Sequence, residues 1–221
     1  MMNKHQIARY IDHTLLKPEA SLSDIGKLCL EAVDYGFASV CVNPCNVEAA
    51  YAGVADSQVR VCTVIGFPLG AGTTAAKVFE AEDAVSSGAQ EVDMVMNIGR
   101  FKEKKFEYVQ KDISAVAASV KGKAVLKVIV ETGFLSDREV KRACEIVRDA
   151  GADFIKTSTG FSKGGATVEH VKIMKGVMGD QIGIKASGGV RNYEQALAMI
   201  AAGATRIGTS AGIEIVKGAT D

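Results

Sequence analysis

Residues 150–155 read Ala-Gly-Ala-Asp-Phe-Ile, and the same design recurs at 35–40 (Tyr-Gly-Phe-Ala-Ser-Val), 87–92 (Ser-Gly-Ala-Gln-Glu-Val) and 202–207 (Ala-Gly-Ala-Thr-Arg-Ile). In each copy a helical pattern ends at a glycine, which adopts left-handed backbone at little cost, and a strand-forming run follows. The copies lie about 50 to 60 residues apart, which fits two β–α units per interval. The repeated joint therefore predicts a chain of alternating strands and helices.

Eight short apolar runs fit this alternation. The predicted strands are Tyr10–Leu15, Ser39–Val42, Arg60–Ile65, Glu91–Met96, Ala124–Val130, Phe154–Thr157, Ile182–Lys185 and Arg206–Ile207. Between them lie helical patterns, one of which begins with the capping box of residues 136–139, Ser-Asp-Arg-Glu. We therefore predict an α/β fold, a single (β/α)8 or TIM barrel over residues 1–221 with a short N-terminal helix before the first strand. A doubly wound open sheet is the structural alternative.

The bulk composition narrows the classes of partner. The 221 residues are 48% hydrophobic, and 26 basic residues balance 26 acidic ones. A balanced chain argues against nucleic acid or an anionic membrane surface as the main partner. No apolar stretch approaches the ~20 residues of a membrane span, and the N-terminus lacks an apolar signal core. Five cysteines and three histidines show no zinc spacing, so we expect a cytoplasmic protein with reduced thiols and no metal or cofactor.

Polar residues interrupt five of the apolar strand runs. They are Asp12, Asp93, Lys127, Lys156 and Lys185. A single strand lysine is usually explained by a side chain that reaches the rim and pairs with a nearby carboxylate. Three lysines with two aspartates are better explained by convergence inside a barrel mouth, because burying an unpaired ammonium is costly.

Such a cluster suits chemistry at a carbonyl group. A second ammonium nearby, or partial burial, lowers the pKa of a lysine and yields a neutral, nucleophilic amine. The iminium that this amine forms with an aldehyde or ketone withdraws electrons, so an adjacent carbon–carbon bond can break without a cofactor. Asp93 could relay protons through water, and the other lysines could stabilise developing oxyanions. These arguments leave open whether Lys156 or Lys185 is the nucleophile.

Glycine-rich loops after the last three predicted strands suggest an anion site. They contain Ser158-Thr159-Gly160, Ser187-Gly188-Gly189 and Thr209-Ser210. Small residues let backbone N–H groups approach a phosphate, and barrels often bind phosphate in the loops after strands 7 and 8. Arg191 could add charge or simply be solvated.

Taken together, the strand motifs resemble those of the deoxyribose-phosphate aldolase family from about Tyr10 to Val216. The matching segments are Tyr-Ile-Asp12-His-Thr-Leu-Leu, Ala-Ser-Val-Cys41-Val, Glu-Val-Asp93-Met-Val, Leu-Lys127-Val-Ile-Val-Glu-Thr-Gly, Phe-Ile-Lys156-Thr-Ser-Thr-Gly and Ile-Lys185-Ala-Ser-Gly-Gly-Val-Arg. The resemblance implies reversible cleavage of 2-deoxy-D-ribose 5-phosphate to D-glyceraldehyde 3-phosphate and acetaldehyde.

The resemblance also implies roles for residues. Lys156 would form the Schiff base, Lys185 would be the neighbouring ammonium that tunes it, and Asp93 would exchange protons through water. Lys127 and Asp12 would complete the polar network. The residues that the resemblance and the loops together assign to substrate and phosphate binding are Cys41, Thr159, Gly160, Gly188, Gly189 and Ser210.

Three further points follow from the resemblance. Cys41 lies where family members can carry a reactive cysteine, although a small buried hydrophobe is the simpler role. The chain ends Gly-Ala-Thr-Asp221 and lacks the C-terminal tyrosine of some members. Family barrels commonly associate, so a homodimer or homotetramer is expected, with phosphosugars and aldehydes as the small-molecule partners.

Two other kinds of function remain as alternatives. One is a different Schiff-base aldolase or a phosphosugar isomerase on the same barrel, because a fold does not fix a function. The other is a non-catalytic phosphosugar-binding protein. Loss of a key lysine or of Asp93 would mark that second case, and the sequence retains them.

Overall fold

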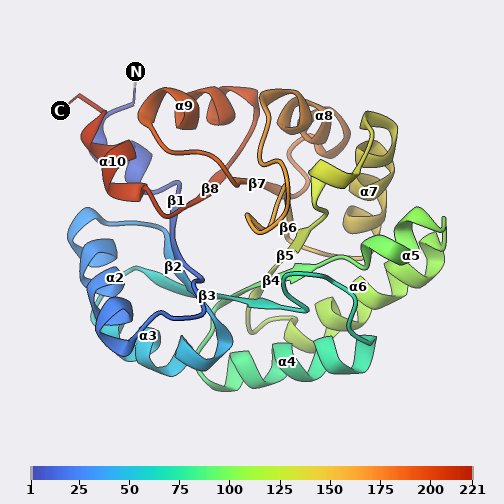
Figure 1. Ribbon diagram of the computed structural model, residues 1–221, viewed down its shortest axis with the longest axis horizontal. Helices are drawn as coiled ribbons and strands as arrows, with labels where there is room; N and C mark the ends of the chain where they lie inside the picture. The colour runs from blue at the N-terminus through green and yellow to red at the C-terminus, as the bar shows by residue number, and fades with distance from the viewer. Residues whose placement is uncertain (1, 221) are drawn as a thin grey trace.

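The computed structural model describes residues 2–220, in which eight parallel strands form a closed barrel in chain order. Helices surround the strands, as the view in Figure 1 shows. The strands are β1 (Ile11–Leu15), β2 (Ser39–Val42), β3 (Arg60–Ile65), β4 (Glu91–Val95), β5 (Val125–Ile129), β6 (Phe154–Lys156), β7 (Gly183–Ser187) and β8 (Arg206–Thr209). Pairing of β1 with β8, for example Asp12 with Gly208, closes the barrel and excludes the open-sheet alternative.

Each strand is followed along the chain by at least one helix. The α-helices are α1 (Lys4–Ala8), α2 (Leu22–Tyr35), α3 (Val47–Val54), α4 (Thr74–Ser86), α5 (Ile98–Lys102), α6 (Phe106–Val120), α7 (Asp137–Asp149), α8 (Val168–Met178), α9 (Tyr193–Ala202) and α10 (Gly212–Lys217), and two 3₁₀ turns are η1 (Pro44–Asn46) and η2 (Thr132–Phe134). The N-terminal helix predicted from the sequence is α1. It packs beside α10 near both chain ends (Figure 1).

The local signals that predicted the helices are visible in the structure. Ser136 caps α7 and forms the reciprocal capping box with Glu139. Gly36 ends α2 in the left-handed region at φ 67°. The residues Ile25, Leu28, Cys29 and Ala32 are buried on the inner face of α2.

Two predicted strand ends were wrong by two residues, whereas the other predicted strand bounds lie within one residue of those observed. We predicted that the seventh strand ends at Lys185, but β7 continues to Ser187, because Ala186 and Ser187 pair with β8. The eighth strand was predicted to end at Ile207, but β8 extends to Thr209, because its last two residues pair with β1. The residues at both ends are small and typical of loops, and only the neighbouring strands supply the hydrogen bonds that keep them extended.

The described residues contain no helix long and apolar enough to cross a membrane. All five cysteines are free thiols, and Cys45 is the exposed one.

Candidate active site

Seven charged side chains converge inside the barrel. They are Asp12 from β1, Glu91 and Asp93 from β4, Lys127 from β5, Lys156 from β6, Lys185 from β7 and Arg206 from β8. Every one is buried, with exposed fractions between 0% and 9%. The five residues that the sequence analysis selected thus lie together. Glu91 and Arg206 were missed.

Asp93 is the centre of the cluster. Its Oδ1 accepts a hydrogen bond from Lys127 Nζ at 2.8 Å, and its Oδ2 accepts from Lys156 Nζ at 2.7 Å and Lys185 Nζ at 2.8 Å. The strand register brings these groups together, since Lys127 pairs with Asp93 and Lys185 pairs with Lys156. Burial opposes ionisation of Asp93, but the three ammonium groups outweigh it and hold the pKa of the carboxyl well below its usual value.

Six of the seven groups form a closed loop of alternating charge, which we call the charge ring. From Lys127 the ring continues to Glu91 Oε2 at 2.6 Å, and Glu91 Oε1 meets Arg206 at 2.5 Å. Arg206 contacts Asp12 Oδ1 at 2.7 Å, and Asp12 Oδ2 contacts Lys185 at 2.6 Å. The contact of Lys185 with Asp93 closes the ring. Three carboxylates therefore face three cations, all desolvated, which is the pairing that buried charge requires.

The partners of Lys185 keep it charged. Burial by itself would lower the pKa of Lys185, but Asp12 and then Asp93 outweigh burial and raise the pKa above its usual value of 10.5. Gly208 on β8 makes room for this side chain, because a Cβ there would lie 2.8 Å from Lys185 Cε. Lys127 likewise has a raised pKa despite its burial, owing chiefly to Asp93.

Lys156 is the seventh group and lies outside the ring. Asp93 is the one carboxylate with which it forms an ion pair among residues 2–220. The charge ring already pairs its three carboxylates with three other cations, so Lys156 is the basic group of the cluster that the ring does not include.

A cavity of about 330 Å³ opens above Lys156 at the carboxyl ends of the strands. Lys156 is the member of the charged cluster that lines it. The remaining lining residues are Thr14, Leu15, Leu16, Lys17, Thr159, Gly160, Phe161, Ser187, Gly188, Gly189, Val190, Arg191, Gly208, Thr209 and Ser210. The cavity is at the lower end of the size range for small-ligand sites. The predicted phosphate residues Thr159, Gly160, Gly188, Gly189 and Ser210 thus line the same cavity as Lys156.

Two basic residues also line this cavity. Arg191, whose role the sequence left open, lies at its edge, and Lys17 was not selected at all. Lys17 comes two residues after the end of β1, so the rule that barrel sites gather after the strands could have found it.

Cys41 does not line the cavity. It is fully buried with Cys62 from the next strand, Leu16 and Val64. A hydrogen bond with Cys62 lowers the pKa of the Cys41 thiol, against the opposing effect of burial. Burial raises the pKa of Cys62 well above its usual value. Cys41 therefore lies near the charged cluster but does not line the cavity.

Cys41, Cys62 and Asp93 are close enough to hold a metal ion, since their ligand atoms lie within 4.8 Å of one another. The donors are already engaged, however. Lys127 Nζ lies 3.3 Å from Cys62 Sγ, and both oxygens of Asp93 accept hydrogen bonds from lysines. A divalent cation would have to displace these ammonium groups, so the group does not fit a metal site.

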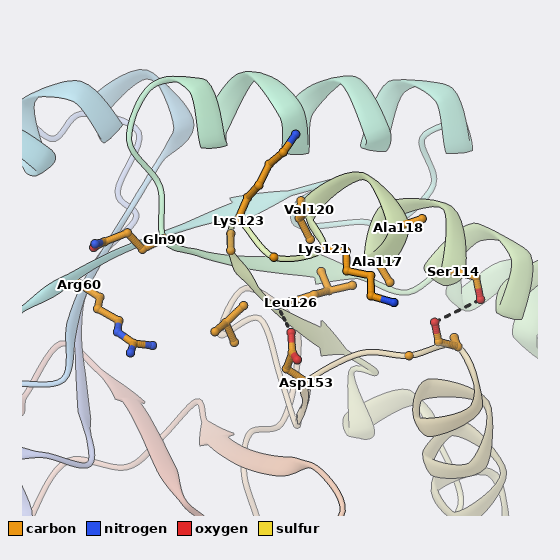
Figure 2. A pocket seen from close by; sticks show the side chains of 15 residues that line it. Arg60, Gln90, Ser114, Ala117, Ala118, Val120, Lys121, Lys123, Leu126 and Asp153 are labelled. Atoms are coloured by element: carbon orange, nitrogen blue, oxygen red, sulfur yellow. Dashed lines mark hydrogen bonds between the residues drawn. The ribbon is translucent and has the colours of Figure 1, made fainter.

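A larger cavity of about 730 Å³ lies where strands begin, at the opposite end of the barrel. Figure 2 shows that Arg60, Lys121 and Lys123 extend in different directions there, while Asp153 accepts a hydrogen bond from the backbone of Leu126. None of the sequence-selected site residues lines it. We therefore select the smaller cavity as the candidate site because titratable groups converge beside it, and not because of its size.

The comparisons with known proteins agree with this geometry. Residues 6–218 match the model of the DeoC/LacD family of aldolases. A protein of Clostridium perfringens named deoxyribose-phosphate aldolase is 58% identical over 98% of this chain and 97% of its own length. One of the same name from Caldanaerobacter subterraneus is 59% identical over 96% of this chain and 92% of its own.

Solved structures give the same result. A crystal structure described as a putative deoxyribose-phosphate aldolase from Coccidioides immitis superposes with a TM-score of 0.95 at 45% identity, covering 98% of this chain and 86% of that one. The deoxyribose phosphate aldolase of Aeropyrum pernix, described as a tetramer, has a TM-score of 0.90 at 33% identity, covering 97% of this chain and 91% of its own.

Proposed function

The chain belongs to the DeoC/LacD family of aldolases, and we propose that it cleaves 2-deoxy-D-ribose 5-phosphate reversibly to D-glyceraldehyde 3-phosphate and acetaldehyde through a Schiff base on Lys156. As an aldolase it is a lyase. The observation that carries the assignment to Lys156 is its position. It borders the cavity, and it is the basic side chain of the cluster that the charge ring does not include.

The neutral amine of Lys156 attacks C1 of the open-chain sugar, and loss of water gives an iminium. Removal of the proton from the C3 hydroxyl then breaks the C2–C3 bond. The electron pair moves into the iminium to form an enamine, and glyceraldehyde 3-phosphate leaves. Protonation of the enamine at C2 and hydrolysis release acetaldehyde and restore the amine. No step requires a metal, so a chelator should leave the rate unchanged.

Asp93 and Lys185 are the two groups that we expect to move the protons. Asp93 accepts a hydrogen bond from the Lys156 amine, and Lys185 donates to the same oxygen of Asp93. The lowered pKa of Asp93 keeps it a carboxylate, and the raised pKa of Lys185 keeps it an ammonium. Asp93, as a carboxylate, accepts protons through water, and Lys185, as an ammonium, donates them. Lys127 and Asp12 hold these two groups in position through the charge ring.

The phosphate end of the substrate binds in the loops after β7 and β8. Gly188 and Gly189 line the cavity with φ of 86° and 84°. Positive φ angles of this size favour glycine, because a residue with a Cβ rarely adopts them. With Gly160 and Ser210 they offer small side chains and approachable backbone N–H groups. Lys17 and Arg191 add positive charge at the same cavity.

Reductive trapping tests the proposal. Incubation with acetaldehyde and borohydride should add an ethyl group to Lys156, found by digestion and mass spectrometry, and Lys156→Arg should abolish the label. Attachment to Lys185 would refute the assignment of the nucleophile. Failure of acetaldehyde to label or react, with dihydroxyacetone phosphate active instead, would show a different aldolase.

We also propose a cytoplasmic homo-oligomer. The described tetramer of Aeropyrum pernix supports association, and exposed apolar side chains such as Leu22, Leu30 and Phe79 offer surface for it. Light scattering of the purified protein measures the assembly. A monomer at micromolar concentration would contradict it.

A further inference from the structure

Glu131 has an unusual position beside the cavity. It follows β5 by two residues, is only 2% exposed, and adopts left-handed backbone at φ 54° and ψ 67°. This region is unfavourable for a residue with a side chain, so surrounding interactions must hold it there. Glu131 forms no ion pair within residues 2–220, although it is a buried acid.

The carboxylate of Glu131 is bound by one residue of the next loop. The backbone N–H of Thr159 donates to Oε1 at 3.3 Å and to Oε2 at 3.2 Å. The hydroxyl of Thr159 donates to Oε2 at 2.5 Å and accepts a hydrogen bond from the N–H of Phe161 at 3.1 Å. Both hydrogen-bond donors of Thr159 are therefore used within the protein, and the turn 159–161 is fixed through them.

This turn is connected to the loop after β7. The hydroxyl of Ser187 donates to the carbonyl of Ser158 at 2.5 Å, and the N–H of Ala166 donates to the carbonyl of Gly188 at 2.9 Å. The backbones are so close that a Cβ on Gly165 would lie 2.4 Å from Gly188 O. Movement of the turn would therefore disturb the wall to which we assign the phosphate.

We propose that Glu131 is a positioning residue for phosphate recognition, acting through Thr159 on the loops after β6 and β7. The inference rests on the proposed function. The hydrogen bonds of Glu131 go to the cavity wall, whereas the charge ring is built from other residues. Thr159 then fixes the loop rather than binding phosphate itself. Loss of Glu131 should weaken binding of the phosphate group and spare the chemistry at Lys156.

The test compares substrates with and without phosphate. In Glu131→Ala, KM for 2-deoxyribose 5-phosphate should rise about 10-fold with kcat nearly unchanged. The reason is that the loop beside the phosphate is no longer held in place by the hydrogen bonds of Glu131 with Thr159. The kcat/KM for unphosphorylated 2-deoxyribose should change less than about 2-fold. The matched control is Glu169→Gln on exposed α8, which should alter neither. Equal losses for both substrates, or no change in either, would overturn the proposal.

Milder variants keep the test valid if Glu131→Ala does not fold. Glu131→Gln offers one acceptor oxygen where the native side chain offers two, and Thr159→Val removes only the hydroxyl. Each should raise KM for the phosphorylated substrate, and the double variant should be less impaired than the product of the two effects, since they break one connection. If the KM increases of the two single variants multiply fully in the double variant, Glu131 does not act through Thr159.

Titration of the protein with inorganic phosphate in a calorimeter separates this inference from the proposed function. Glu131→Ala should bind phosphate about 10-fold more weakly than the parent, whichever sugar is cleaved. Unchanged phosphate affinity overturns the role of Glu131. Failure of the parent to cleave deoxyribose 5-phosphate overturns the proposed function alone.

Discussion

Lys156 and Lys185 donate hydrogen bonds to the same oxygen of Asp93, at 2.7 and 2.8 Å. They differ in their other partners. Lys185 also contacts Asp12 and has a raised pKa. Lys156 borders the cavity, and Asp93 is the one carboxylate with which it pairs in the described part of the chain. Two adjacent lysines are thus distinguished by the number of anions that each one meets.

Lys185→Leu should reduce kcat by about 100-fold or more, the range associated with loss of a positioned proton-transfer group. Lys185 donates to Asp93, which also accepts from Lys156, so the variant loses the proton donor nearest to the reacting amine. Steady-state kinetics of sugar cleavage measure kcat, with Lys172→Leu on the exposed face of α8 as control. Full activity in Lys185→Leu would rule out a role for Lys185 in proton transfer.

Asp93→Asn should destabilise the fold at pH 7 by about 3–5 kcal/mol, because it leaves buried ammonium groups without their shared anion. Urea denaturation measures the free energy of unfolding. If the variant is as stable as the parent, the cluster is hydrated rather than buried.

Acid stability follows from the depressed pKa values of Asp12 and Asp93, each normally 3.8. As pH falls below this value the unfolded chain takes up protons first, so the free energy of unfolding decreases until the folded carboxyls also protonate. The stabilisation is complete above that pH. Denaturation between pH 2 and 6 should show this slope in the parent and a shallower one in Asp93→Asn. Parallel slopes would count against ionised native carboxylates.

Arg206→Met should cost about 3–5 kcal/mol, because Asp12 and Glu91 each lose a buried partner. Arg206→Lys should recover little of it, since a single ammonium cannot reproduce a planar guanidinium that reaches two carboxylates. Chemical denaturation of both variants distinguishes geometry from charge. Full recovery by lysine would show that charge alone matters.

Ser136→Ala should destabilise the protein by about 1 kcal/mol by removing the N-cap of α7. Ser136→Asn, which keeps a capping oxygen, should cost much less. Thermal melts of the pair measure this, and equal losses would show that capping is not the cause. Activity should be unaffected, as α7 lies on the outer layer (Figure 1).

The β–α alternation and five members of the charged cluster could be predicted from local patterns along the chain. Repeated glycine joints such as Gly36 require left-handed backbone wherever the chain folds, so they are local signals. Asp93 and Lys127 were recognisable because a charge inside an apolar strand has no local explanation. Glu91 was missed because it begins its strand and resembles a solvated end. Its spacing of two residues from Asp93 places both on one face and could have revealed it.

The contacts among these residues could not be predicted, because they form only in the folded barrel. Register places Lys156 opposite Lys185, and closure of β8 onto β1 brings Arg206 to Asp12 across 194 residues. The pairing of anions with cations involves seven groups from six strands, so it cannot be predicted from any one segment of the sequence. The ends of β7 and β8 likewise depend on partner strands. Local conformation is a property of short segments, whereas charge pairing and burial arise only when distant strands share one interior.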